Sequence, residues 1–383
     1  FYIAYFVMAI PSGILLKKVG FKRGIMYGFM LTALGAFLFV PAALVRQFEI
    51  FLIGLFSIGT GLAILQTAAN PYVTIIGPIE SAARRISIMG ICNKFAGIIS
   101  PLIFAALILK ADDSELFSLI ESGTLDAITK SAMLDELIQR VIVPYAILGG
   151  LLVLAGIEIR YSILPEINTD EQNATDEKEN GHNSKKSIFD FPYLILGALA
   201  IFFHVGTQVI AIDTIINYAN SMGIDLLEAK VFPSYTLACT MIGYILGILI
   251  IPKYVSQTKA LIICTVLGLL LSFGVVFADF NVTLFGHQAN ISIFLLCALG
   301  FPNALIYAGI WPLSIHGLGK FTKTGSSLLI MGLCGNAILP LIYGYFAEVY
   351  DLRIGYWILI PCFLYLIFFA TKGHKINSWK RNY

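Results

Sequence analysis

The sequence predicts an all-α protein that crosses a membrane many times. Of its 383 residues, 58% are hydrophobic and only 13% are charged, and the mean hydropathy is +0.85. A soluble domain has about 45–50% apolar and about 25% charged residues. This composition excludes a soluble globular enzyme and a disordered chain. The net charge of +2 is too small to indicate a nucleic-acid partner.

The charged residues are clumped, most densely in two segments, and the rest lie mostly in short clusters between long apolar runs. Residues 111–140 hold nine and residues 158–187 hold eleven of the 48 Lys, Arg, Asp and Glu side chains. The runs between the charged segments are continuous and rich in Leu, Ile, Ala and Gly. Because barrel strands would alternate apolar and polar residues, the runs predict spanning helices.

Eleven runs approach or exceed the length of about 20 apolar residues that a helix needs to cross a bilayer. They are residues 1–16, 24–45, 48–72, 86–109, 141–163, 190–219, 230–251, 259–279, 289–315, 325–347 and 354–372. Segment 111–140 is amphipathic at best, and we expect it to be an acidic extracytoplasmic insertion at the membrane surface or in solvent. The polar segment 164–189 is expected to be a linker.

The positive charges predict the orientation of these helices. Lys and Arg residues in alternating loops number 18 on one side of the membrane and 6 on the other. The side richer in Lys and Arg is assigned to the cytoplasm. The linker 164–189 and the C-terminus are then cytoplasmic, in a multi-pass protein of a bacterial-type inner membrane.

Short motifs recur in the same order in the two halves of the chain. Ile88–Cys92 matches Ile330–Cys334, and Pro101–Ile103 matches Pro340–Ile342. The repeat predicts two pseudo-symmetric helical bundles, residues 1–163 and 190–383. Internal symmetry of this kind is typical of secondary transporters, whose substrate site lies near the bilayer midplane between the repeats.

The second half has one helix more than the first. The run 190–219 precedes the helix that contains Gly247–Ile250, but no run precedes the matching Gly13–Leu16, and the chain lacks an initiator Met. We therefore expect that one N-terminal helix is absent from this sequence. Twelve helices would be the full number, of which eleven are present.

The first basic turn combines a small residue, a glycine turn and a cationic cluster. These features come from Gly13, Lys17, Gly20, Lys22 and Arg23. The arrangement resembles the loop motif of the major facilitator superfamily between its second and third helices. The acidic residue that is usual in that motif is absent here, which puts charge-relay gating through this loop in question.

Two longer stretches resemble the fucose:proton symporter family, which includes glucose/galactose transporters. They are Leu65–Pro78 with the following Ala82–Arg85, and Gly317–Ser327. The resemblance implies the major facilitator fold and uptake of a hexose driven by a cation gradient. It also implies a departure, because the L-fucose symporter has a glutamate in the fourth helix where this chain has Gln66. Gln66 cannot titrate, and the other carboxylate of the family lies in the missing first helix, so H⁺ and Na⁺ both stay open as co-ions.

Polar side chains in the third and fourth apolar runs are candidates for substrate binding. Such groups are costly in lipid unless they face a cavity or a partner. Gln66 and Asn70 share one helical face, and their amides can pair with neighbouring sugar hydroxyls. Asn93 is a further candidate, and Lys94 is either part of an ion pair or a coupling cation. The alternative for the amides is hydrogen bonding between helices.

The run 190–219 is the most polar. His204 and Gln208 are four residues apart, as are Asp213 and Asn217, so each pair would share a helical face. Gln208, Asp213 and Asn217 are expected to bind substrate, and His204 and Asp213 are candidates for coupling or gating. A packing histidine and a salt bridge near the outer end of the helix are the alternatives.

Asn303, Tyr307 and Trp311 recur at intervals of four in the run 289–315. Together they present an amide, a phenol and an indole, which can bind a sugar through its hydroxyls and its C–H face. The alternative for the two aromatic residues is an anchor in the membrane interface. Asn336 is a secondary candidate.

The sequence contains no motif of an enzyme, a P-loop or a metal site. Its six cysteines form no Cys-x-x-Cys pair and its five histidines are scattered, so we expect neither a cofactor nor a metal. The predicted function is import of a hexose by alternating access, coupled to H⁺ or Na⁺, in a monomer within the lipid bilayer. An exporter, a carrier of amino sugars and a non-transporting nutrient sensor are the alternatives.

Overall fold

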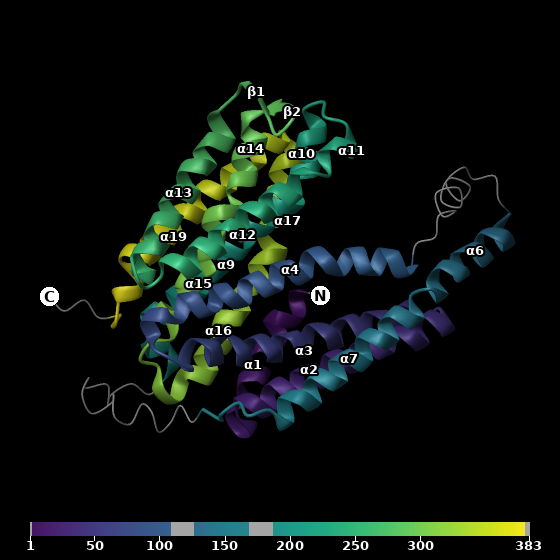
Figure 1. Cartoon of the computed structure of the whole chain (residues 1–383), viewed down its shortest axis with the longest axis horizontal. Helices are drawn as coiled ribbons and strands as arrows, with labels where there is room; N and C mark the ends of the chain where they lie inside the picture. Colours follow the sequence, from purple (N-terminus) through teal and green to yellow (C-terminus); the bar gives the residue numbers. More distant parts are fainter. Residues whose placement is uncertain (1, 109–125, 168–186, 380–383) are drawn as a thin grey trace. The chain divides into compact units, whose positions relative to one another are not determined.

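The computed structural model describes residues 2–108, 126–167 and 187–379, which form helices and one short β-hairpin (Figure 1). The helices of the first half are α1 (Tyr2–Val19), α2 (Phe21–Val45), α3 (Phe48–Ile75), α4 (Ala82–Ile108), α6 (Ala127–Gln139) and α7 (Ile142–Tyr161). Those of the second half are α9 (Pro192–Asp213), α10 (Ile215–Ser221), α11 (Leu226–Ala229), α12 (Phe232–Ile250), α13 (Gln257–Phe277), α14 (Ile291–Ala298), α15 (Gly300–Ile315), α16 (Thr322–Met331), α17 (Gly335–Val349), α18 (Leu352–Gly355) and α19 (Leu359–Thr371).

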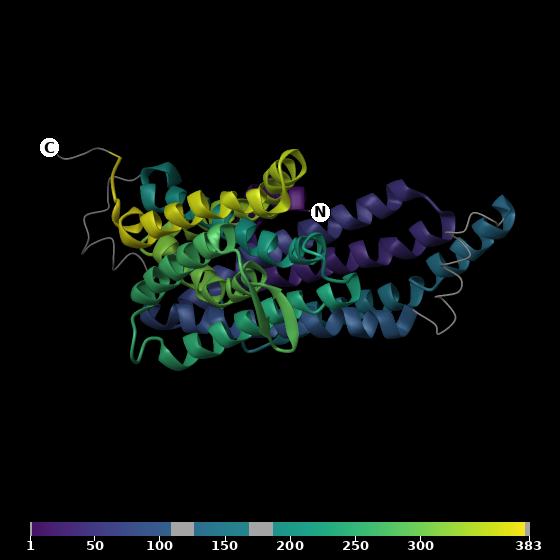
Figure 2. The ribbon, with the colours of Figure 1, turned by 90° about the horizontal axis from the view of Figure 1, so that it is seen from above.

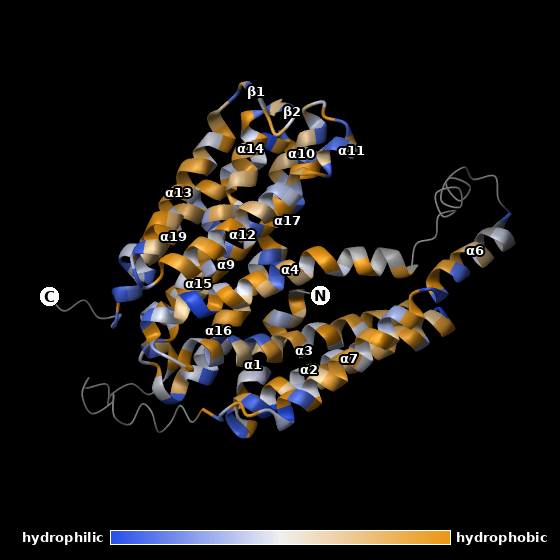
Figure 3. Ribbon diagram, viewed as in Figure 1, coloured by the Kyte–Doolittle hydropathy of each residue, from blue (hydrophilic) through white to orange (hydrophobic). Residues whose placement is uncertain are grey.

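Nine helical segments among the described residues are long and apolar enough to span a membrane. They coincide with nine of the eleven predicted runs, and α1 and α4 lie over the other two. Figure 3 shows the apolar residues along the helices and hydrophilic residues mostly at helix ends and in loops. The prediction of a multi-pass helical membrane protein is therefore confirmed.

The hairpin was not predicted from the sequence. Strands β1 (Asn281–Leu284) and β2 (His287–Asn290) pair antiparallel between α13 and α14, and Figure 2 shows their two arrows beside one another. The two turn residues, Phe285 and Gly286, both have positive φ angles, of 53° and 83°. This is the backbone that a two-residue hairpin turn requires. The hairpin is a short addition to a fold that is otherwise helical in its described residues, as predicted.

Several predicted spans are interrupted. The run 190–219 is divided into α9 and α10 at Thr214, and the run 289–315 into α14 and α15 at Leu299. In the run 325–347, a 3₁₀ turn (Gly332–Cys334) separates α16 from α17. Interrupted helices are tolerated in a membrane protein where the freed backbone groups find other partners or line a cavity.

The chain is divided into two compact units. The first comprises Lys22–Leu65 and Phe95–Pro165, and the second comprises Tyr2–Phe21, Gln66–Lys94 and Glu166–Tyr383. Helices α3 and α4 thus contribute to both units. The predicted domain boundaries at 163 and 190, which follow the sequence repeat, stay a prediction.

The first unit is held together by small residues at helix contacts. A Cβ atom added to Gly35 of α2 would lie 2.7 Å from the backbone oxygen of Gly54 in α3. Gly61 of α3 approaches Thr32 of α2 in the same way. In lipid, where apolar surface gives no drive to associate, such close backbone packing stabilises helix pairs.

Part of the predicted insertion 111–140 is seen in this unit. Asp126 caps α6 by accepting a hydrogen bond from the backbone of Thr129, at 3.2 Å. Arg46, just after α2, forms an ion pair with Asp135 and donates to Ser131 at 3.1 Å. Residues 109–125, and residues 168–186 of the predicted linker, lie outside the described residues.

The second unit also uses glycines where its helices approach closely. A Cβ atom at Gly13 of α1 would lie 1.9 Å from Oγ of Ser327 in α16. At Gly335 of α17 it would lie 2.0 Å from the backbone oxygen of Phe202 in α9. These contacts bring together helices that are far apart in the sequence.

Candidate functional site

The candidate substrate-binding and coupling residues from the sequence all lie in the second compact unit. They are Gln66, Asn70, Asn93, Lys94, His204, Gln208, Asp213, Asn217, Asn303, Tyr307 and Trp311. Helices α3, α4, α9, α10 and α15 contribute them. The first unit contains none of them, although its helices are as apolar as those of the second.

Tyr307 lies at the centre of the arrangement. The amide Nδ2 of Asn70 in α3 donates a hydrogen bond of 2.9 Å to the hydroxyl of Tyr307 in α15. The Tyr307 ring centroid is 6.0 Å from that of Trp311 and 6.2 Å from that of His204 in α9. Polar side chains of three helices therefore meet around one phenol.

Gln66 reaches a partner that the sequence did not suggest. Its Nε2 donates a hydrogen bond of 3.2 Å to the hydroxyl of Tyr5 in α1, and Tyr5 is buried. Nothing in the sequence distinguished Tyr5 from a tyrosine of the membrane interface. The amide that replaces the family glutamate thus joins α3 to α1.

Three of the candidate side chains are almost completely buried. The exposed fraction is 1% for His204 and Asn303 and 0% for Trp311. An anchor in the membrane interface would expose its indole to lipid, so that alternative for Trp311 is wrong. Within the part of the chain that the structure describes, Nδ1 of His204 and Oδ1 of Asn303 have no hydrogen-bond partner. Buried polar atoms of this kind call for a partner such as water or a ligand.

Lys94, Asp213 and His204 all belong to the second unit. The charge of Lys94 interacts electrostatically with Asp213 and with His204, although no direct ion pair joins Lys94 to Asp213 among the described residues. Lys94 is half-buried, whereas Asp213 is exposed. The three residues that the sequence offered for coupling or gating are therefore close enough for their charges to interact.

The remaining candidates are less enclosed. Gln208 is half-buried, and Asn93 and Asn217 are exposed. The expected pairing of Asp213 with Asn217 on one continuous helical face is wrong, because α9 ends at Asp213 and α10 begins at Ile215.

The loop motif has the structure that its residues predict. Gly20 lies between α1 and α2 with a φ of 81°, which a residue with a Cβ rarely adopts. Gly13 allows the close contact of α1 with α16 described above. Lys17 lies in the last turn of α1, and Lys22 and Arg23 in the first turn of α2; Nζ of Lys22 donates to the backbone oxygen of Ser162 at 2.5 Å.

A carboxylate from the predicted linker caps the helix that follows the motif glycine Gly20. Oε1 of Glu166 accepts a hydrogen bond of 2.6 Å from the backbone N–H of Phe21, the first residue of α2. A carboxylate at a helix N-terminus is favourable, because the first N–H groups have no partner within the helix. Glu166 is 145 residues from Phe21 in sequence, so no local motif could reveal the contact.

Arg85 is a second residue that the sequence did not single out for a role. All five of its N–H donors have acceptors at the end of α3 and in the following turn. These acceptors are the backbone oxygens of Val73, Thr74, Gly77 and Pro78 and the hydroxyl of Ser81, at 2.6–3.2 Å. Arg85 therefore fixes the start of α4, which holds Asn93 and Lys94, to the end of α3, which holds Gln66 and Asn70.

The described residues contain no group of three His, Cys, Asp or Glu side chains that could hold a metal ion. The six cysteines are free thiols. The chemistry that the candidate residues of the second unit offer is thus hydrogen bonding, aromatic contact and the opposite charges of Lys94 and Asp213. Groups of this kind can form hydrogen bonds with a neutral polar molecule.

The comparisons with known proteins agree with this assessment. A family model described as Major Facilitator Superfamily matches residues 1–334. A glucose/galactose transporter of Brucella abortus is 32% identical over 380 residues, which cover 98% of this chain and 84% of the relative. The L-fucose-proton symporter of Escherichia coli is 31% identical over 375 residues, which cover 97% of this chain and 82% of the symporter.

A solved structure has the same architecture. The crystal structure of FucP, a Major Facilitator Superfamily transporter in the outward conformation, superposes with a TM-score of 0.80 at 27% sequence identity. The match covers 99% of this chain and 88% of the FucP chain. The similarity therefore includes both halves of the sequence and the whole set of candidate residues.

Proposed function

Because the chain belongs to the major facilitator superfamily, a superfamily of membrane transporters, we propose that it is a secondary active transporter that imports a hexose with a proton. The relatives named above are a glucose/galactose transporter and an L-fucose-proton symporter. Neither name describes an exporter, a sodium-coupled carrier or a sensor. All eleven predicted runs cross the membrane in this proposal, with the linker and the C-terminus in the cytoplasm of a bacterial cell.

The observation that carries the proposal is the cluster around Tyr307. The Asn70 amide, the Tyr307 phenol, the Trp311 indole and the buried atoms of His204 and Asn303 supply donors, acceptors and an aromatic face from three helices. A sugar has hydroxyls that both donate and accept, and one apolar C–H face. The buried polar atoms without a protein partner are suited to pair with those hydroxyls.

Gln66 binds sugar in this proposal but takes no part in proton transfer. An amide can donate and accept hydrogen bonds and cannot change its charge. Its bond to Tyr5 orients the amide, so that the carbonyl oxygen is left to accept from a hydroxyl.

Asp213 and Lys94 carry the coupling. Asp213 is an exposed carboxylate at the end of α9, and its charge interacts with that of Lys94. Protonation of Asp213 would remove that attraction. The conformation that the protein favours can therefore depend on whether Asp213 carries a proton. Alternation between states that favour and disfavour the charged pair would link proton movement to sugar movement.

Uptake into proteoliposomes tests the proposal. Labelled glucose, galactose and fucose are offered with and without an inward pH gradient, and with a sodium gradient alone. We expect one hexose to accumulate only with the pH gradient. If no hexose enters under any gradient, the substrate class is wrong. Accumulation with a sodium gradient alone would contradict the proposal that the co-ion is a proton.

Two variants separate binding from coupling. Gln66→Ala should raise the KM for the sugar with unchanged expression, because it removes a hydrogen-bonding group. Asp213→Asn should abolish accumulation but retain sugar exchange without a gradient. Thr32→Val is the matched control, since the Thr32 hydroxyl bonds only within α2 of the first unit, at 2.8 Å to Gly28. Normal accumulation by Asp213→Asn would assign coupling to another residue.

A further inference from the structure

The break between α9 and α10 comes directly after Asp213. Thr214 separates the two helices with φ −93° and ψ −13°. Its hydroxyl donates a hydrogen bond of 2.7 Å to the backbone oxygen of Ile210, one turn earlier. Threonine hydroxyls that bond back in this way bend helices. The direction in which Asp213 leaves α9 therefore depends on how Thr214 is held.

A second hydroxyl holds Thr214 from another part of the chain. The hydroxyl of Tyr356 lies 2.7 Å from Oγ1 of Thr214. Since the single hydrogen of Thr214 Oγ1 is donated to Ile210, Tyr356 is the donor in this contact. Tyr356 follows α18 in a short 3₁₀ turn (Tyr356–Ile358), 142 residues from Thr214 in sequence.

Tyr356 itself is rigidly packed. Its exposed fraction is 0%, and its ring centroid lies 4.9 Å from those of both Tyr218 in α10 and Tyr343 in α17. A buried aromatic side chain between two others has little freedom to turn. The donor at Thr214 is thus fixed by side chains from α10 and α17.

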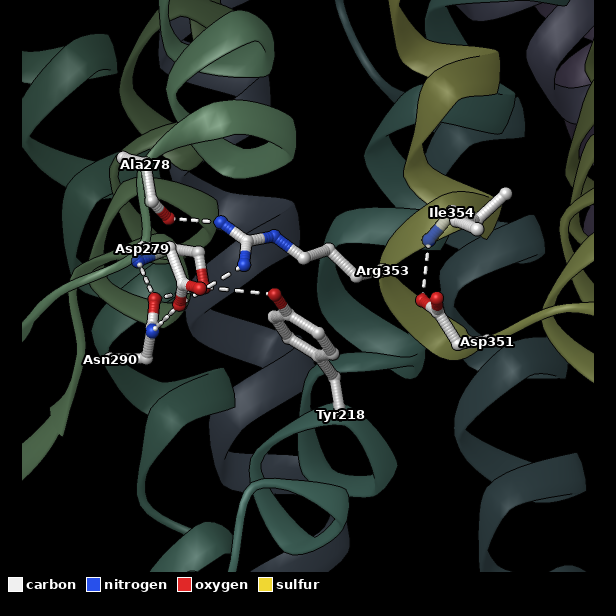
Figure 4. A network of polar contacts seen from close by, with 8 residues as sticks. Tyr218, Ala278, Asp279, Asn290, Asp351, Arg353 and Ile354 are labelled. Atoms are coloured by element: carbon white, nitrogen blue, oxygen red, sulfur yellow. Dashed lines mark hydrogen bonds and ion pairs between the residues drawn. The ribbon is translucent and has the colours of Figure 1, made fainter.

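The surroundings of this tyrosine cluster are also tied together by hydrogen bonds. Tyr218 bonds to Oγ of Ser292 at 2.8 Å, and Ser292 in turn donates to Asn290 at 2.7 Å. Asn290 donates to Asp279 at 2.8 Å, and Asp279 pairs with Arg353 at 3.1 Å (Figure 4). The chain of contacts leads from α10 through the start of α14 back to α18, three residues before Tyr356.

We propose that Tyr356 is a positioning residue for coupling, which acts through Thr214 to set the helix break and thereby the direction of Asp213 toward Lys94. This inference rests on the proposed function, because it gives the position of Asp213 a role in transport. Tyr356 touches neither sugar nor proton in this proposal. It supplies one hydrogen bond at the residue that separates α9 from α10.

The test compares Tyr356→Phe with a matched control. Tyr356→Phe keeps the ring contacts and removes the bond to Thr214. Tyr365→Phe removes a comparable bond to the same helix, from Tyr365 in α19 to the backbone oxygen of Leu196 at 3.0 Å, near the opposite end of α9. Thr214→Val removes the same contact together with the bond back to Ile210, and it serves if Tyr356→Phe does not fold.

The primary measurement is the rate at which a lipophilic carbodiimide modifies Asp213, followed by mass spectrometry of the purified full-length protein. A lost hydrogen bond of ordinary strength changes such an equilibrium about fivefold. We expect a change of about that size in Tyr356→Phe, a change at least as large in Thr214→Val, and no greater change in the double variant than in Thr214→Val alone. Tyr365→Phe should leave the rate unaltered.

Transport supplies the second measurement. Tyr356→Phe should lower proton-driven accumulation about fivefold with little change in the KM for sugar exchange, in line with the loss of one hydrogen bond. An unchanged modification rate in Tyr356→Phe and Thr214→Val, or an equal change in Tyr365→Phe, would overturn the positioning role. Failure of the wild-type protein to move any hexose would overturn the proposed function instead, since the modification assay does not depend on transport.

Discussion

The two compact units are made of similar apolar helices, and hydroxyls bond back to their own helices in both. Thr32 and Thr60 do so in the first unit, each at 2.8 Å, and Thr74 and Ser272 do so in the second. The second unit has, in addition, side-chain bonds between elements distant in sequence, from Asn70 to Tyr307 and between Thr214 and Tyr356. A polar group bonded within its own helix requires no particular neighbour, whereas a bond between helices fixes their relative rotation. The bonds between helices indicate that the second unit needs a defined geometry around the candidate residues.

The largest expected effect is on packing in the first unit. Gly35→Ala would place a Cβ atom 2.7 Å from backbone atoms of Gly54 and Ile58, which cannot rotate away. We expect a loss of about 3 kcal/mol in stability, at the upper end for overpacking. Gly97→Ala in α4 of the same unit has no atom within 4 Å of the new Cβ and should be neutral or stabilising. Thermal unfolding in detergent measures both, and equal melting temperatures would contradict the packing role of Gly35.

The next largest effect is expected at Arg85, whose hydrogen bonds fix the start of α4 to the end of α3 in the second unit. Arg85→Lys replaces five N–H donors by three on a flexible chain and leaves backbone oxygens of α3 without partners. We expect a loss of about 2 kcal/mol in stability together with a raised KM for sugar. The exposed neighbour Arg84 is the control, and Arg84→Lys should behave as wild type. If both variants have wild-type KM values, Arg85 does not position the site.

Tyr307→Phe tests the bond between helices that best distinguishes the second unit. It removes the acceptor of the Asn70 amide and leaves that buried group without a partner. We expect a cost of about 1.4 kcal/mol, which is about tenfold in the KM for sugar. Thr60→Val in the first unit removes a hydroxyl that bonds within its own helix and should leave the KM unchanged. A tenfold change in the KM of Thr60→Val would contradict the view that the bond between Asn70 and Tyr307 has a special role in sugar binding.

The smallest effect is expected at Asp279, which follows the end of the spanning helix α13 at Phe277 and lies outside that segment. Hydrogen bonds from Asn290 and Arg353, together with the positive charge of Arg353, hold the pKa of this carboxyl below its ordinary value. The ionised form makes these contacts, so their contribution to stability is complete above about pH 4. That contribution is lost as the pH falls through the lowered pKa.

Asp279→Asn should therefore melt slightly below wild type at pH 7. The gap should close when the pH falls well below 4, because wild-type Asp279 is then protonated. Melting curves at the two pH values, compared with Asp225→Asn, check this prediction. If the difference in melting temperature between wild type and Asp279→Asn grows in acid, ionised Asp279 does not stabilise the protein.

The sequence by itself determined the class of the protein. Apolar runs of spanning length dictate helices, because each backbone group in lipid must find its partner within the segment. The roles of the motif glycines could also be predicted. Gly13 has the small size that close helix packing demands, and Gly20 has the positive φ of a tight turn. The amides of Gln66 and Asn70 stood out because polar groups are rare and costly in such runs.

Only the tertiary structure decided which of these residues meet. Tyr5 is 61 residues from Gln66, and Glu166 is 145 residues from Phe21. The burial of Trp311 and the break at Thr214 were equally hidden, as both depend on neighbouring helices. The physical reason is that a helix apolar on every side has no polar face to show which way it turns. Its rotation is set by the close contacts of distant helices, and those contacts exist only in the folded chain.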